Sequence, residues 1–337
     1  MNKKLRILSF LTALLLLASL CSCGLGFIPN LPQIGGRDEE PFVPNEITEV
    51  VATSFENSYG DQLSPNERVL YDTVAAAKAG ENEFTVTLPE PVTVCKNRAP
   101  TEEEQNNTKE RLTYWISNAL FAIWMDEPAL FWLDFGDYRY TCTFKQNEER
   151  IVGVTELTVT VSLRTDSASA VSRKDLLDAV LKAYTPYGAN DAERVRSINR
   201  FLCDKVTYNL DAPDRGTAVG ALVDGSCVCE GYARAFQLLC QRAGITCVCI
   251  LGDSMADGER EGHMWNAVRI DGVWYYCDPT WNDTTERLTK YLLVGGETPG
   301  VKDKDGNTPT FDETHIPQNT LGQSKPFALP AVSKTAR

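Results

Sequence analysis

Residues 229–233 read Cys-Glu-Gly-Tyr-Ala, and they are followed by Gly-His-Met-Trp-Asn at 262–266 and Asp-Pro-Thr-Trp at 278–281. The first motif supplies a thiol, the second an imidazole and the third a carboxylate. This order of groups can build a cysteine nucleophile with a general base and an acid that orients the base. Only two histidines occur in the whole chain, and one of them lies in this cluster. A chemical role for that histidine is therefore a stronger hypothesis than it would be in a histidine-rich chain.

The relation between His263 and Asp278 depends on the turn that lies between them. The Asp-Gly pair at 271–272 is typical of a two-residue hairpin turn, which joins a strand ending at Ile270 to a strand beginning at Val273. With Ile270 opposite Val273, His263 and Asp278 share one face of the hairpin as diagonal neighbours, about 7–8 Å apart between backbones. Since a carboxylate can reach an imidazole N–H across that distance, the turn predicts an orienting pair.

Cys229 is expected at the start of a helix over residues 229–242, which Gly244 ends. The unpaired N–H groups and the positive end of that helix favour a thiolate there. His263 beside the sulfur would add a cationic partner and a proton shuttle. Cys227, two residues earlier, is expected to point elsewhere and not to replace Cys229.

Together the three motifs resemble the transglutaminase-like superfamily, and the resemblance covers about residues 190–295. It implies an α+β, papain-like core in which the helix carrying the cysteine packs on an antiparallel sheet. It also implies roles: Cys229 as nucleophile, His263 as general base and Asp278 as orienting carboxylate. The chemistry implied is acyl transfer, in which the thiolate attacks a protein or peptide amide and water or an amine releases the thioester. Similar extracytoplasmic bacterial members with lipid anchors favour hydrolysis, by a cysteine protease or peptidase, over cross-linking.

Three aromatic residues near the motifs, Trp265, Trp281 and Tyr232, are candidates for binding the acyl substrate. Large aromatic residues at such positions more often pack in the core of a domain than bind a substrate. Both roles are kept as hypotheses, and the substrate groove is the more specific one. The backbone N–H of Cys229 is the candidate that the sequence offers for stabilising an oxyanion. No upstream side-chain donor can be identified from the sequence.

Two weaker patterns could indicate metal sites. Cys227-x-Cys229 and Cys247-x-Cys249 suggest zinc, but their one-residue spacing departs from the usual two to four residues. Residues 303–307 hint at a calcium loop, but the glycine and the closing glutamate are not at the required offsets. We therefore expect no metal and no cofactor. A different class of function is also open: a catalytically silent surface-binding or assembly module that keeps the fold.

The net charge of the chain argues against one class of binding partner, the nucleic acids. The chain of 337 residues carries a formal charge of −13, whereas nucleic-acid binding needs clustered lysine and arginine. We therefore expect no nucleic acid. The expected partners are a protein or peptide substrate and, through a lipid anchor, the membrane, while the oligomeric state is left open.

The first residues indicate export. Basic residues within 3–6 precede a mostly apolar run at 8–20, which is shorter than the ~20 residues of a membrane-spanning helix and suits a secretory signal. The run ends in Leu-Cys-Ser-Cys-Gly, which resembles a bacterial lipobox, and Cys23 after the small Ser22 fits lipidation better than Cys21. A cleaved signal without lipid is the alternative. The protein is therefore expected on the extracytoplasmic face of the bacterial cell membrane, and of its eleven cysteines nine remain when these two are removed.

Composition and periodicity divide the chain into five parts. The expected catalytic domain follows a small α+β domain in which no catalytic groups gather, and the polar, proline-containing end is expected to be irregular. The parts are a signal peptide (1–23), a proline-rich tether (24–58), the α+β domain (59–165), the transglutaminase-like domain (166–295) and a C-terminal extension (296–337).

Overall fold

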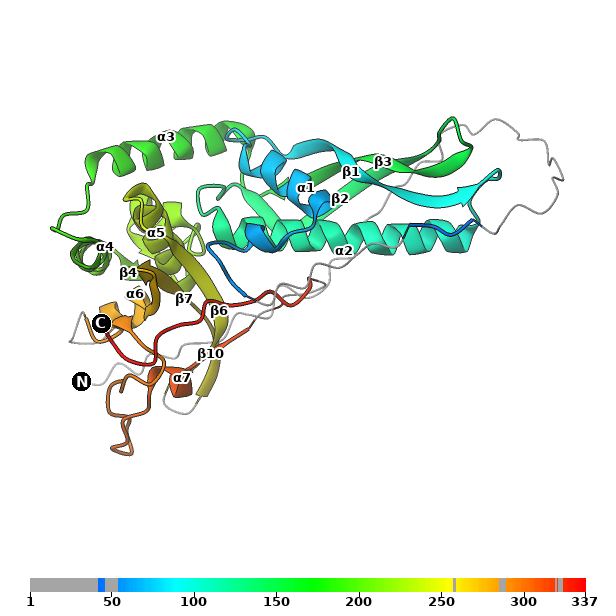
Figure 1. Cartoon of the computed structure of the whole chain (residues 1–337). Helices are drawn as coiled ribbons and strands as arrows, with labels where there is room; N and C mark the ends of the chain where they lie inside the picture. The colour runs from blue at the N-terminus through cyan, green and yellow to red at the C-terminus, as the bar shows by residue number, and fades with distance from the viewer. Residues whose placement is uncertain (1–41, 46–53, 257–258, 285–288, 319, 321–323) are drawn as a thin grey trace.

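Figure 1 shows the computed structural model of the protein. The structure describes residues 42–45, 54–256, 259–284, 289–318, 320 and 324–337. The expected signal segment, both lipidation candidates (Cys21 and Cys23) and most of the expected tether lie outside the described residues. The described residues form an α+β structure with two main sheets.

The first sheet has three antiparallel strands in the order β1-β3-β2: β1 (Glu83–Lys96), β2 (Leu133–Gln146) and β3 (Ile151–Leu163). Buried and exposed residues alternate at the start of β1, as expected for a strand with one face on the core. Two helices pack with this sheet, α1 (Pro65–Ala75) and α2 (Glu102–Asp126). Figure 1 shows the long helix α2 running alongside the sheet.

The second sheet has five antiparallel strands in the order β10-β6-β7-β8-β9. Its strands are β6 (Cys247–Ala256), β7 (Glu259–Ile270), β8 (Val273–Cys277), β9 (Leu292–Val294) and β10 (His315–Pro317). Helix α5 packs against β6 and β7 and extends over Cys229–Arg242, which confirms the helix predicted from the sequence. A helix packed on an antiparallel sheet is the α+β arrangement that the family resemblance implied.

Shorter elements connect these parts. Strand β4 pairs in parallel with β5, so that Tyr208 lies opposite Cys227 just before the chain enters α5. The remaining elements are α3 (Ser167–Ala183), α4 (Asp191–Lys205), α6 (Pro279–Thr284), α7 (Phe311–Thr314), β4 (Thr207–Tyr208), β5 (Ser226–Cys227), the 3₁₀ turn η1 (Gly60–Gln62) and the π-helical turn η2 (Gly220–Asp224).

The C-terminal region is more ordered than the sequence suggested. We expected residues 296–337 to be irregular, but α7 and β10 form within them, and β10 adds an edge strand to the second sheet. Phe311 and Phe327 are buried, so this region contributes apolar side chains to the core. The expectation was wrong for residues 311–317 because a three-residue edge strand carries no detectable periodicity.

The two sheets are joined through one face of α5. Arg234, Gln237 and Gln241 donate hydrogen bonds to the backbone carbonyls of the last three residues of α2, at 2.6, 2.8 and 2.9 Å. The last carbonyls of a helix have no partner within it, so side chains from α5 satisfy them. The helix that begins at Cys229 is therefore held by the end of α2.

These hydrogen bonds between α5 and α2 predict that substitutions at two glutamines of α5 lower the free energy of unfolding by different amounts. Gln237→Met removes a fully buried donor and leaves the Met125 carbonyl without its partner. We expect the free energy of unfolding to fall by about 1–3 kcal/mol, measured by urea unfolding at neutral pH. Gln241→Met is the matched control, because Gln241 is exposed and water can replace it. Equal losses in the two variants would contradict a role for burial.

All nine cysteines among the described residues are free thiols. Seven of them are buried, and the two with partly exposed side chains are Cys203 and Cys229. No helix among the described residues combines the length and the apolar character needed to cross a membrane.

Candidate active site

The hairpin formed by β7 and β8 has the register that the sequence predicted. Ile270 lies opposite Val273, and the pairing continues to Asn266 opposite Cys277. The two turn residues at 271–272 have positive φ angles of 50° and 83°, as a tight two-residue hairpin requires. Asp278 follows β8 directly and is thereby placed on the same side of the hairpin as His263.

His263 and Asp278 form a buried pair. Nε2 of His263 lies 2.7 Å from Oδ2 of Asp278, and the side chains are 6% and 0% exposed. The other carboxylate oxygen accepts the backbone N–H of Trp281 at 3.0 Å. Because Nε2 is hydrogen-bonded to the carboxylate, Nδ1 is the ring nitrogen that can exchange a proton with another group.

Cys229 lies at the first turn of α5. Its side chain lies near the His263 ring, because interaction with Cys229 raises the pKa of that histidine. The preceding N-cap residue, Val228, brings no side-chain acceptor to the helix end, so the N–H groups of the first turn stay available for negative charge. Gly231 lets the helix approach the neighbouring loop, since a Cβ there would lie 2.5 Å from both the Arg215 carbonyl oxygen and the Cys227 Cβ.

The electrostatics of the pair favour an imidazolium and a carboxylate. Burial lowers the pKa of His263, but the negative charge of Asp278 and hydrogen bonds with Asp278 and Cys229 outweigh it and raise that pKa to about 10. Burial would raise the pKa of Asp278, but the positive charge of His263 and hydrogen bonds from His263 and His315 hold it below its usual range. The structure thus brings together the three residues that the sequence singled out.

His315 is a fourth polar residue of this site, and the sequence analysis missed it. It is 1% exposed, and its Nε2 lies 3.1 Å from the same Oδ2 of Asp278 that His263 contacts. It comes from β10, in the region expected to be irregular. The available signal was that His315 is the second of only two histidines in the chain.

The same residues have the spacing of a possible metal site. One donor atom each from His263, Asp278 and His315 lies within 4.8 Å of the others. In the structure these atoms are already joined by hydrogen bonds, since both imidazoles contact one carboxylate oxygen. Within the part of the chain that the structure describes, the cysteines weighed as zinc ligands join no such group.

The three aromatic candidates for substrate binding lie in different environments. Trp265 and Tyr232 have no exposed surface, and the Tyr232 hydroxyl contacts Asp283 Oδ2 at 2.5 Å. Neither therefore offers a surface to a substrate in this structure. Trp281 is partly exposed, and its ring centre lies 5.9 Å from that of His263.

Tyr208 is a further side chain near the thiol. Burial raises the pKa of Tyr208 above its usual value, and negative charge at Cys229 raises it further. Its position opposite Cys227 in the β4–β5 pair places it beside the entrance to α5. The resemblance to the superfamily included residues 206–208, but no contact between this phenol and the thiol was predicted, because a two-residue strand pair cannot be recognised from sequence.

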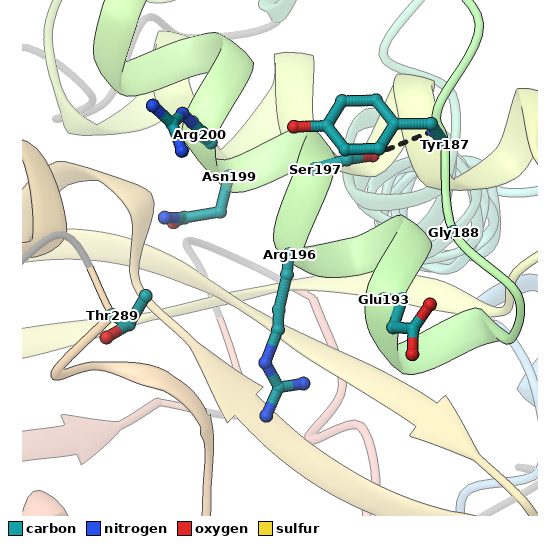
Figure 2. Close-up of a pocket in the computed structure, with 8 residues that line it drawn as sticks. All are labelled: Tyr187, Gly188, Glu193, Arg196, Ser197, Asn199, Arg200 and Thr289. Atoms are coloured by element: carbon teal, nitrogen blue, oxygen red, sulfur yellow. Dashed lines mark hydrogen bonds between the residues drawn. The ribbon is translucent and has the colours of Figure 1, made fainter.

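A separate pocket of about 370 Å³ lies along α4. None of the residues that line it belongs to the group around Cys229 (Figure 2). Its lining residues are Tyr187, Gly188, Glu193, Arg196, Ser197, Asn199, Arg200 and Thr289.

The raised pKa of His263 predicts how two alkylating reagents should differ at Cys229. The imidazolium attracts the iodoacetate anion but not neutral iodoacetamide, so the ratio of their labelling rates should be high at pH 6–8. That ratio should fall by about fivefold as the pH rises past 10 and His263 loses its proton. Rates measured by peptide mass spectrometry test this, and His263→Gln should give a low ratio at every pH.

Comparison with known proteins places these motifs in a family. The model of the transglutaminase-like superfamily matches residues 178–279. Kyphoscoliosis peptidase of Mus musculus is 33% identical over 170 residues, which cover 45% of this chain and 25% of that protein. Its Homo sapiens counterpart is 32% identical over 127 residues, covering 34% and 19%. This chain therefore spans a quarter or less of the length of these relatives.

A solved structure described as a TGase also resembles the chain, with a TM-score of 0.29 and 10% identity over 43% of this chain and 51% of that one. The family match covers α5 and the β6–β8 region that position the thiol, imidazole and carboxylate. The chain therefore carries a domain of the transglutaminase-like superfamily, with the α+β, papain-like fold of that superfamily.

Proposed function

We propose that this protein is a cysteine enzyme that acts on protein or peptide amides through a thioester on Cys229. The observation that carries the proposal is the position of His263, which is hydrogen-bonded to the buried Asp278 carboxylate and lies near enough to Cys229 for the thiol to raise its pKa. A general base held between a nucleophile and an orienting acid is the arrangement that acyl transfer requires.

The first half of the reaction forms the thioester. The Cys229 thiolate attacks the amide carbon, and the carbonyl oxygen becomes an oxyanion. The backbone N–H of Cys229 and the Tyr208 hydroxyl are the donors proposed to stabilise it. The imidazolium of His263 then gives a proton to the amide nitrogen, the C–N bond breaks, and an amine leaves.

The second half releases the acyl group. Neutral His263 accepts a proton from water as the water oxygen attacks the thioester carbon, the C–S bond breaks, and a carboxylic acid leaves. The thiolate and imidazolium are restored, with Asp278 holding the ring. An amine in place of water would give transamidation, but we propose hydrolysis, because the curated relatives with at least 30% identity are named peptidases.

A two-part experiment tests this function. Purified protein is incubated with a denatured, lysine-blocked protein and a labelled primary amine, and the products are examined by mass spectrometry. New amino termini that are lost in Cys229→Ala support a peptidase, whereas incorporated amine supports cross-linking chemistry. If Cys229→Ala leaves all products unchanged, the enzyme proposal fails, and a silent binding module becomes the better description.

We further propose that the protein is exported and anchored by a lipid on Cys23, as the sequence of its first residues indicates. Expression of the full chain in a bacterium, followed by membrane fractionation and mass spectrometry of the mature amino terminus, tests this. Cys23→Ala should release the protein from the membrane fraction. Retention of that variant, with an acyl group on Cys21, would move the site to Cys21.

A further inference from the structure

We propose that His315 is a positioning residue of this site: its neutral ring donates a hydrogen bond that fixes the Asp278 carboxylate against His263. This proposal rests on the proposed function, because it assigns His315 a part in preparing the same thiol. His315 acts on the carboxylate that orients His263.

The surroundings of the carboxylate show why a second imidazole matters. Asp278 is fully buried, so its charge must be stabilised by donors of the protein and not by bulk water. Oδ2 receives His263 at 2.7 Å and His315 at 3.1 Å, and Oδ1 receives the Trp281 N–H at 3.0 Å. Both oxygens are thus fixed, and rotation of the carboxylate would break contacts on both sides.

The hydrogen-bond network assigns the protonation state of His315. Burial lowers the pKa of His315, although its bond with Asp278 opposes that effect. The neutral ring must carry its proton on Nε2, since an unprotonated nitrogen would face the carboxylate oxygen. Nδ1 then lies 2.9 Å from the Thr314 hydroxyl, whose single proton can point to this nitrogen or to the Phe311 carbonyl oxygen 3.0 Å away. The titratable groups that face the ring are Asp278, His263 and Tyr291.

The fold holds the His315 ring in this place. The ring stacks on Phe311, with centres 3.8 Å apart and planes 9° from parallel, and it meets the Trp265 ring edge-on at 5.1 Å. Its strand, β10, pairs with β6, where Gly252 leaves room: a Cβ at Gly252 would lie 2.2 Å from the Ile316 carbonyl oxygen. The edge strand β10 therefore holds the Nε2 atom of His315 next to the Asp278 carboxylate.

Two variants separate a donor from a packing role. His315→Phe keeps an aromatic ring against Phe311 but removes the donor, whereas His315→Gln loses the ring but can place an amide N–H near the former Nε2. The rate of Cys229 labelling by iodoacetamide is measured from pH 4 to pH 10 on the full chain, with thermal melting as the check on folding.

We expect His315→Phe to slow labelling about tenfold at pH 5–6 and to raise the pH of half-maximal rate by about one unit, since a hydrogen bond to a charged group has that size. His315→Gln should stay within about twofold of the parent protein. A folded His315→Phe that labels like the parent, or a folded His315→Gln that is tenfold slower, overturns the proposal. If His315→Phe does not fold, the labelling rate of His315→Gln alone decides the proposal.

A second measurement uses the fact that the chain has only two histidines. In tag-free protein labelled with ¹⁵N-histidine, His315 should give a neutral ring protonated on Nε2 at pH 7, while His263 should give a charged ring. A charged His315, or one protonated on Nδ1, contradicts the proposal. So does stoichiometric zinc in the purified protein that is lost in His315→Gln, because the ring would then be a metal ligand.

The outcomes also separate this proposal from the proposed function. If Cys229 of the parent protein labels no faster than Cys203, the function fails before His315 is considered. If Cys229 labels fast and depends on His263, but His315→Phe changes nothing, then only the role of His315 is lost.

Discussion

His263→Ala is expected to slow the labelling of Cys229 by iodoacetamide about 100-fold at pH 6. An ordinary cysteine ionises near pH 8.5, so that only about one in 300 is a thiolate at pH 6. In the parent protein the imidazolium of His263 lies near the Cys229 sulfur and attracts negative charge there, whereas the alanine variant has no such partner. Peptide mass spectrometry after timed labelling measures the rate at each cysteine.

Cys203 is the internal control in the same samples. Among the described residues it is the other partly exposed cysteine, and burial raises its pKa to about 12, so it should label slowly in both proteins. A general loss of structure in His263→Ala would speed Cys203, which separates unfolding from loss of the ion pair. Unchanged labelling of Cys229 at pH 6 would show that the imidazole does not activate the sulfur.

Local signals in the sequence predicted the part of the site that depends on short-range structure. The Asp-Gly turn at 271–272 fixes the register of β7 and β8, and the register in turn predicts that His263 and Asp278 meet. Because side chains alternate along a strand, one residue of slippage would have placed the two on opposite faces. The start of α5 could also be predicted from a local signal, which is the helical spacing of apolar residues after Cys229.

The contribution of His315 could not be predicted in this way. It follows Asp278 by 37 residues and reaches it through a three-residue strand, which is too short to show alternation. Pairing of β10 with β6 depends on long-range packing of side chains such as Phe311, and on the space left at Gly252. Proline content favoured an irregular segment there, but edge strands tolerate proline because one side of the strand forms no ladder.

The joint between α5 and α2 also depends on long-range structure. From the sequence alone, a glutamine or arginine on a helix is expected to be exposed to solvent. In the structure, Gln237 is buried against the end of α2. The consequence for the site is direct, because the helix that carries Cys229 is fixed along its length by a second structural unit. The end of α2, a helix that packs with the N-terminal sheet, thus supports the helix that carries the thiol.

Asp278→Asn should be the most destabilising of the single substitutions considered. In the parent protein three N–H groups converge on the carboxylate, two at Oδ2 and one at Oδ1. An asparagine has one acceptor oxygen and one NH₂ group, so in either orientation its NH₂ group faces an N–H donor. If it faces the imidazoles, His263 must give up its Nε2 proton and cannot be an imidazolium. Breaking a buried pair in this way costs about 3–5 kcal/mol.

The dependence of this loss on pH identifies its cause. The lowered pKa of Asp278 stabilises the fold above the ordinary value near 3.9, and that stability is lost as the pH falls further. The raised pKa of His263 stabilises the fold below about 6.5, and that stability is lost as the pH rises toward 10. The difference in unfolding free energy between the parent and Asp278→Asn should therefore be largest between about pH 4 and pH 6.5 and should shrink toward pH 10. Urea unfolding across this range measures it. Asp283→Asn is the control, because Asp283 accepts from the Tyr232 hydroxyl and, among the described residues, both imidazoles are hydrogen-bonded to Asp278 instead. A loss that is constant with pH would mean that the substitution disturbs packing alone, and that the charges of His263 and Asp278 do not stabilise one another.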